Sequence, residues 1–149
     1  MFKKKSTLIV LGIAVVILGF VFYPGVRSSD APRSVPCLLP NLSLVQHLHP
    51  TLAITVDGEP ETVPANIGLS QTCERAIHTH DPDGVIHVEA QDRRAYTFGD
   101  FLWVWNKNLN RDGYALDVFV DGERFTENLA ELEFEDRQAI ELRYATPGQ

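Results

Sequence analysis

The sequence predicts an α+β protein, in which an N-terminal transmembrane helix is followed by a small mixed sheet with one packed helix. Three observations support this prediction. Residues 6–26 form an uncharged apolar run, short strand-like segments are separated by Asp-Gly turns, and residues 97–109 show helical spacing of large apolar side chains. We therefore divide the 149 residues into an anchor (1–26), a tether (27–44) and an α+β domain (45–146).

The N-terminal run is long enough to cross a membrane as a helix. About 20 apolar residues, each rising about 1.5 Å, span ~30 Å of hydrocarbon, and residues 6–26 just suffice. Lys3, Lys4 and Lys5 precede the run, so the positive-inside rule places them in the cytoplasm and the rest of the chain outside. A cleaved signal peptide is the alternative, but residues 24–27 offer no small-x-small cleavage site.

The charge distribution excludes nucleic acid as the main partner. Of the 13 basic residues, 10 lie in residues 25–149, whereas all 20 acidic residues lie there. A domain with this acidic excess lacks the Lys and Arg side chains that neutralise phosphates.

The two cysteines fit an extracytoplasmic location. Cys37 lies in the tether, where several prolines and small polar residues favour an extended chain, and Cys73 lies in the domain. An even number of cysteines in an oxidising space favours a disulfide, which would close a loop of about 35 residues and contribute ~3 kcal/mol. The alternative is that Cys73, five residues before His78, is a metal ligand.

Strand, turn and helix signals alternate along the domain. The helical segment should pack an aromatic face, because Phe98, Phe101 and Trp105 recur at helical spacing. The expected elements are a hairpin of residues 52–56 and 62–64 about Asp57-Gly58, a strand at 84–89, a helix capped by Thr97 that ends between Asn106 and Gly113, a hairpin starting at 115–120 about Asp121-Gly122, and a closing strand at 139–144.

The order of these elements resembles a β-grasp (ubiquitin-like) arrangement with an extra segment between the first hairpin and the helix. A sheet with one helix on one face is the economical packing for this order. The resemblance implies a topology and carries no function with it.

The five histidines carry the main chemical signal, and all lie between residues 47 and 87. They occur as His47-Leu-His49, His78-Thr-His80 and His87-Val-Glu, each motif pairing donors at positions i and i+2. In an extended chain such positions share a face. Imidazole and carboxylate groups suit Zn²⁺ or Cu²⁺, and three or four of them complete a mononuclear site.

We expect His80 and His87 to be the principal ligands, with His78 next. The turn at residues 82–84 can fold the strand of His87 back beside His78 and His80 at a low cost in loop entropy. His47 or His49 would complete the shell from a separate strand.

Two acidic residues accompany these motifs. Asp81 follows His80, and Glu89 lies two residues after His87, so either could accept the second N–H of a ligating imidazole. If the metal kept an open coordination position, either acid could also act as a catalytic base. The competing interpretation is structural: residues 78–84 form a polar turn, and His87 is a half-buried strand histidine.

Several motifs occur together in residues 45–144. They are His47-x-His49, Val63–Gly68, Cys73, His78–Asp81, Gly84–Glu89 and Thr97–Phe101. As a set they resemble a family of prokaryotic membrane-anchored proteins with HxH, HTHD and IHVE motifs, to which no activity is assigned. The resemblance implies one N-terminal anchor and an extracytoplasmic domain.

Three hypotheses for the function follow. The first is a membrane-tethered, extracytoplasmic domain that binds Zn²⁺ or Cu²⁺ through its histidines. The second is a β-grasp-like module that binds a protein partner outside the membrane and uses its histidines structurally. The third is a metal-dependent enzyme.

Overall fold

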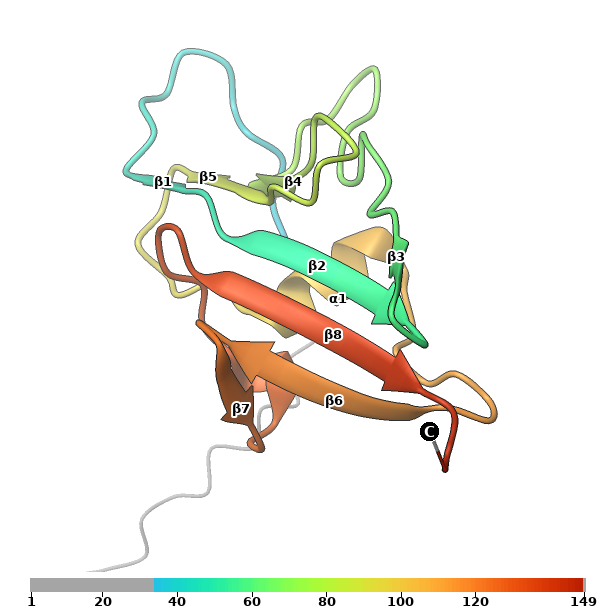
Figure 1. Ribbon diagram of the computed structural model, residues 1–149. Helices are drawn as coiled ribbons and strands as arrows, with labels where there is room; N and C mark the ends of the chain where they lie inside the picture. Colours follow the sequence, from blue (N-terminus) through green and yellow to red (C-terminus); the bar gives the residue numbers. More distant parts are fainter. Residues whose placement is uncertain (1–33, 149) are drawn as a thin grey trace, which may run out of the picture. The chain divides into compact units, whose positions relative to one another are not determined.

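The computed structural model of the protein describes residues 34–148. It shows a small mixed α+β domain with two sheets and one α-helix (Figure 1). The predicted anchor over residues 6–26 lies outside the described residues. Between residues 34 and 148, no helix is long and apolar enough to cross a membrane.

The larger sheet has five strands in the order β3-β2-β8-β6-β7. The two central strands, β2 and β8, run parallel, and each outer pair is an antiparallel hairpin. The strands are β2 (Thr51–Val56), β3 (Glu59–Glu61), β6 (Ala115–Val120), β7 (Glu123–Phe125) and β8 (Ala139–Ala145).

Asp-Gly pairs form the turns of both hairpins, as predicted. Asp57 and Gly58 have φ angles of 48° and 86°, and Asp121 and Gly122 have 52° and 83°. Two successive positive φ angles match the twist of a tight hairpin. The return strand β3 therefore starts directly at Glu59, and the prediction that it lies at residues 62–64 is wrong.

The helix α1 (Phe98–Trp105) begins and ends where the sequence predicts. Thr97 and Asp100 form a reciprocal capping box, and Asn106 ends the helix in the left-handed region at a φ of 55°. Phe98 and Phe101 are fully buried and belong to the same core cluster as the central strands β2 and β8. Figure 1 shows α1 covering one face of the five-stranded sheet.

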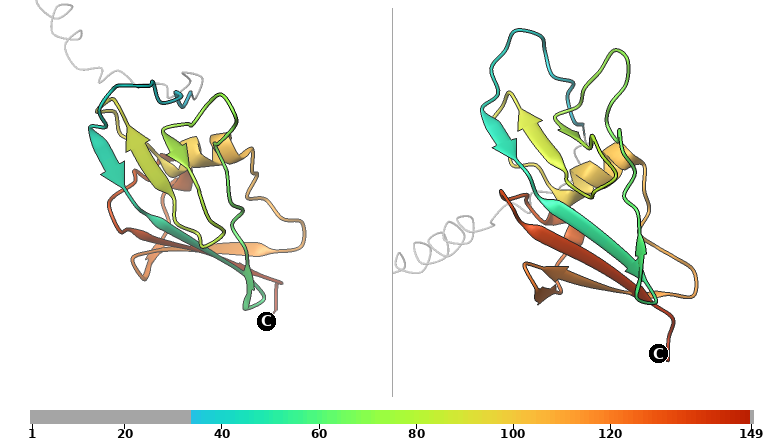
Figure 2. Two further views of the ribbon diagram at one scale, coloured as in Figure 1. Left: turned by 90° about the horizontal axis from the view of Figure 1, so that it is seen from above. Right: turned by 45° about the horizontal axis from the view of Figure 1, so that its top comes forward.

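The smaller sheet has three short antiparallel strands in the order β1-β5-β4. They are β1 (Gln46–Leu48), β5 (His87–Ala90) and β4 (Ile77–His78). β1 corresponds to the separate strand expected to carry His47 or His49, β4 is not predicted from the sequence, and β5 starts three residues later than the strand expected from Gly84. The chain continues from β1 into β2, and the two views of Figure 2 show the small sheet beside one end of β2.

Hydrogen bonds fix the small sheet to the large one. The Leu52 N–H donates to the Gly84 carbonyl at 2.8 Å, and the Ile86 N–H donates to the Pro50 carbonyl at 2.9 Å. The segment that leads into β5 is therefore held against the start of β2.

Part of the predicted tether belongs to the domain. Val35 is buried in the core, with 2% of its surface exposed. The Leu38 N–H donates to the Glu74 carbonyl at 2.7 Å, and the Ala76 N–H donates to the Pro36 carbonyl at 2.9 Å. The ordered domain thus starts earlier than the predicted boundary at residue 45, because this segment pairs with the chain before β4.

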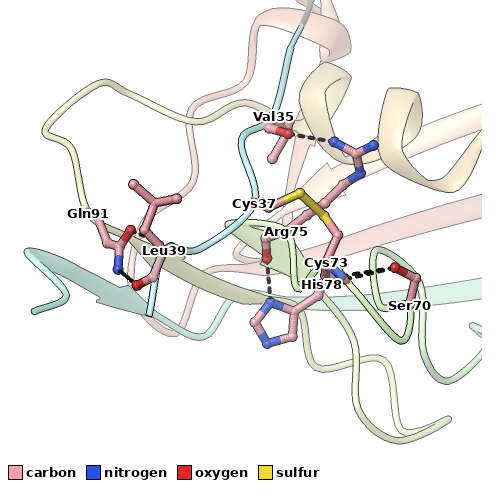
Figure 3. The surroundings of a disulfide bond; sticks show 8 residues. All are labelled: Val35, Cys37, Leu39, Ser70, Cys73, Arg75, His78 and Gln91. Atoms are coloured by element: carbon pink, nitrogen blue, oxygen red, sulfur yellow. Dashed lines mark hydrogen bonds between the residues drawn. A yellow bond between two sulfur atoms is a disulfide. The ribbon is translucent and has the colours of Figure 1, made fainter. Parts of the chain in front are cut away.

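The predicted disulfide is present. Cys37 and Cys73 are bonded, with their Cα atoms 5.3 Å apart (Figure 3). Cys73 is therefore not available as a metal ligand, which removes the alternative that the sequence left open.

Candidate metal centre

The small sheet gathers the five histidines through its register. His87 on β5 lies opposite His78 on β4, and Glu89 on the same strand lies opposite His47 on β1. Positions 87 and 89 share one face of β5 because side chains alternate along a strand. His49 and His80 follow two residues after His47 and His78, respectively. Three segments that are separate in the sequence therefore present imidazoles around β5.

Neighbouring histidine rings of this cluster lie within contact distance of one another. The ring centroids of His78 and His80 are 4.7 Å apart, those of His80 and His87 4.7 Å, and those of His78 and His87 5.4 Å. His49 lies 5.0 Å from His87 and 4.6 Å from His47. The expected convergence of residues 78, 80 and 87 is thus observed, and it is joined by His47 on β1 and by His49 directly after β1.

The ring of His78 is held in one orientation. Its side chain is fully buried, and its Nδ1 lies 2.8 Å from the Arg75 carbonyl oxygen (Figure 3). A carbonyl can only accept a hydrogen bond, so Nδ1 carries the proton and Nε2 of the neutral ring offers a lone pair. A second N–H that donates to a backbone carbonyl is the usual support of a ligating histidine.

The lone pair of His78 points to a place where an ion would fit. Its Nε2 lies 3.1 Å from the Nε2 of His80. Two nitrogens bound tetrahedrally to one ion at ~2.0–2.1 Å are separated by about 3.3 Å. The observed spacing is close to that of two ligands of one metal ion, and it is also that of a hydrogen bond from a His80 N–H to His78 Nε2.

His87 has an environment that favours its neutral form. Burial lowers its pKa below the ordinary value of 6.5, and positive charge on His80, His78 and His49 would lower it further, whereas Glu89 opposes the change. Its Nδ1 is buried and has no hydrogen-bond partner. An unpartnered, unprotonated ring nitrogen is the form of histidine that binds metal ions.

Carboxylates flank the rings on two sides. A Glu89 Oε1 atom lies 3.1 Å from His47 Nε2 and 3.8 Å from His87 Nδ1. Glu74 Oε1 lies 3.4 Å from His78 Nε2. These charges offset the cost of bringing a divalent cation to the cluster.

The second predicted acid, Asp81, is placed differently. It is exposed, and it belongs to none of the metal-capable groups that residues 34–148 form. The turn that brings His87 back points this side chain outward. Asp136 instead approaches the cluster, accepting a hydrogen bond from the His49 backbone N–H at 3.1 Å and lying 3.8 Å from His49 Nδ1.

The described residues form three groups whose ligand atoms lie within 4.8 Å of one another. We name two of them by their burial. The inner triad is His78, His80 and His87, and the outer triad is His47, His49 and His87; the third group is Glu74, His78 and Glu89. The histidines are thus positioned to hold a metal ion.

Comparisons with known proteins do not identify the chain. No protein-family profile, curated protein or solved structure matches it. Its function is therefore argued from the residues of the cluster.

Sequence reasoning missed two members of the site. Glu74 lies four residues before His78 and contacts its ring, and Asp136 lies in the loop before β8 and contacts His49. Glu74 follows the disulfide cysteine directly, which is the one signal that could have drawn attention to it. Asp136 offers no such signal, because only the tertiary structure brings residues 49 and 136 together.

Proposed function

We propose that this protein binds a transition-metal ion through its inner triad. The observation that carries the proposal is the orientation of His78, whose Nδ1–H is engaged by the Arg75 carbonyl while its Nε2 lies 3.1 Å from His80 Nε2. His80 is exposed, which gives an ion a route to the site.

The donor set favours Zn²⁺ or Cu²⁺. Both ions accept several imidazoles with a carboxylate or water, and both bind imidazole more strongly than Mg²⁺ or Ca²⁺ do. The disulfide leaves no thiolate in the chain, and Met1 is the single methionine, so a site built for copper(I) is disfavoured. Glu74 or Glu89 would supply the fourth ligand or orient a bound water.

We also propose that the domain works outside a membrane, tethered by residues 6–26. The disulfide supports this location because such bonds persist in oxidising compartments. The order of charges around residues 6–26 supports the same topology.

A β-grasp-like classification of the larger sheet and α1 is part of this proposal. Its support is the strand order. β2 and β8 are the first and last strands of this sheet in the sequence, yet they are adjacent and parallel within the sheet. In addition, α1 lies in the chain between the two hairpins. The small sheet, with β4 and β5 inserted before α1, is the addition that carries the histidines.

Metal analysis of the full chain tests the proposal. The chain, purified in detergent, is stripped with chelator, loaded separately with Zn²⁺ or Cu²⁺, and dialysed at neutral pH. We expect stoichiometric binding that is lost in His87→Ala, because His87 belongs to both triads. The matched control is Asp81→Ala, which removes a neighbouring exposed acid and should bind metal as the unmodified chain does. Retention below about 0.2 equivalents of either ion by the folded chain would refute metal binding and leave the interaction-module hypothesis.

A further inference from the structure

His87 is shared by two different sets of three histidines. The inner triad combines it with His78 and His80, and the outer triad combines it with His47 and His49. β5 is the middle strand of the small sheet, so β4 supplies partners on one side and β1 on the other. No other residue belongs to both triads.

An imidazole ring can serve two ions because its nitrogens lie on opposite edges. His87 Nδ1 is buried without a hydrogen-bond partner and lies 3.8 Å from Glu89 Oε1. The same carboxylate oxygen is 3.1 Å from His47 Nε2, which places Nδ1 near a ligand atom of the outer triad. If Nδ1 binds an ion of the outer triad, Nε2 is the nitrogen left for an ion of the inner triad.

Two carboxylates lie among the histidines of the two triads. Glu89 flanks the outer triad through His47, and Glu74 lies 3.4 Å from Nε2 of His78 in the inner triad. Two divalent ions on one face would repel each other strongly if nothing compensated their charge. Glu74 and Glu89 have carboxylate oxygens within 4.8 Å of each other and of a ring nitrogen of His78, so both contribute that compensation between the two triads.

We propose that the small sheet holds two transition-metal ions bridged by His87. The ion of the inner triad is bound by His78, His80 and one nitrogen of His87, and the ion of the outer triad by His47, His49 and Nδ1. When the second metal–nitrogen bond forms, the bridging ring releases its N–H proton to solvent and becomes an imidazolate. With metal–nitrogen bonds of ~2.0–2.1 Å on either side of the ring, the two ions lie about 6 Å apart. This inference rests on the proposed metal binding and extends it from one ion to two.

The test combines stoichiometry with magnetic coupling in the full chain loaded with Cu²⁺. We expect about two equivalents of copper and a low-temperature paramagnetic resonance signal much weaker than two isolated ions give, because an imidazolate bridge couples their spins antiferromagnetically. His80→Ala and His47→Ala change exposed side chains, one in each triad, and should fold normally. Each should retain about one equivalent with the full signal of an isolated ion. Asp81→Ala should retain two coupled ions.

The outcomes separate the two proposals. One equivalent in the unmodified chain that persists in His47→Ala and disappears in His80→Ala would overturn the bridge while leaving metal binding by the inner triad in place. Two equivalents with the full signal of uncoupled ions would also overturn the bridge. Failure of the chain to retain either Cu²⁺ or Zn²⁺ would overturn both proposals.

Discussion

Replacing Gly68 by alanine should disturb the inner triad without removing a ligand. Gly68 has a φ of +77°, and a Cβ at this position would lie 2.5 Å from the Ile77 carbonyl oxygen, 2.9 Å from Val104 Cγ1 and 3.2 Å from His78 Cβ. The Ile77 carbonyl is part of the β4 backbone and cannot rotate aside. The strand that carries His78 must therefore move.

Two terms set the expected loss of stability. An L-residue in the left-handed region costs about 1–2 kcal/mol. Displacing β4 weakens the hydrogen bonds that join it to residues 66–69, including Thr79 N–H to the Ile67 carbonyl and Arg75 N–H to the Gly68 carbonyl, each at 3.0 Å. Two such bonds contribute about 1–3 kcal/mol. Gly68→Ala should thus lower the free energy of unfolding by about 2–5 kcal/mol.

Gly113→Ala is the matched control. Gly113 has a similar φ of +83°, but a Cβ there would meet nothing within 4 Å. It should therefore lose only the backbone term of about 1–2 kcal/mol. Urea unfolding of the metal-free variants measures both losses. A metal titration of the folded proteins should show at least about tenfold weaker binding in Gly68→Ala and unchanged binding in Gly113→Ala.

Two results would refute this reasoning. Equal losses of stability in the two variants would mean that the contacts with β4 contribute nothing. A destabilised Gly68→Ala that binds metal with unchanged affinity would mean that the position of His78 does not control the site.

Three further predictions concern pH, the disulfide and topology. Because the pKa of His87 is lowered on folding, the unfolded chain binds this proton more readily, and the stability of the metal-free chain should fall as the pH drops through 6.5. Thermal scans should show a weaker pH dependence of stability in His87→Gln, and an unchanged pH profile in this variant would contradict the prediction. Replacing Cys37 and Cys73 by serine opens a loop with a sequence separation of 36 and should lower the free energy of unfolding by about 3–4 kcal/mol in urea, whereas a loss under about 1 kcal/mol would speak against this. Protease added to intact spheroplasts should digest the domain, and full protection would overturn the predicted orientation of residues 6–26.

Much of the larger sheet could be predicted because its signals are local. An Asp-Gly pair specifies a tight hairpin by backbone conformation alone, and both pairs do so here. The reciprocal contacts of Thr97 and Asp100 likewise require only three residues of spacing. The return strand of the first hairpin lies at Glu59–Glu61 and not at 62–64. Pro60 can stand in it because β3 is an edge strand, where a missing N–H is tolerated.

The pairing of the small sheet and its strand β4 could not be predicted, because these short strands are held in place by their neighbours. β4 is two residues long and has no alternation of its own, and β1 pairs only with β5. The spacing of the histidines was sufficient to predict that residues 78, 80 and 87 converge, since one turn connects them. That His49 and His47 approach the opposite side of His87 depends on pairing over about forty residues, which no local pattern encodes.

The disulfide determines where a force on the N-terminal segment enters the domain. A pull on the chain before Val35 is transmitted to residues 73–76 through the Cys37–Cys73 bond and the backbone pairs of residues 36–38. The Arg75 guanidinium also holds the Val35 carbonyl, at 2.6 Å, and the Arg75 carbonyl orients His78 (Figure 3). If residues 6–26 anchor the chain and the histidines bind an ion, as we propose, tension on the segment before Val35 would act on the residue that orients His78 and would change the affinity of the site.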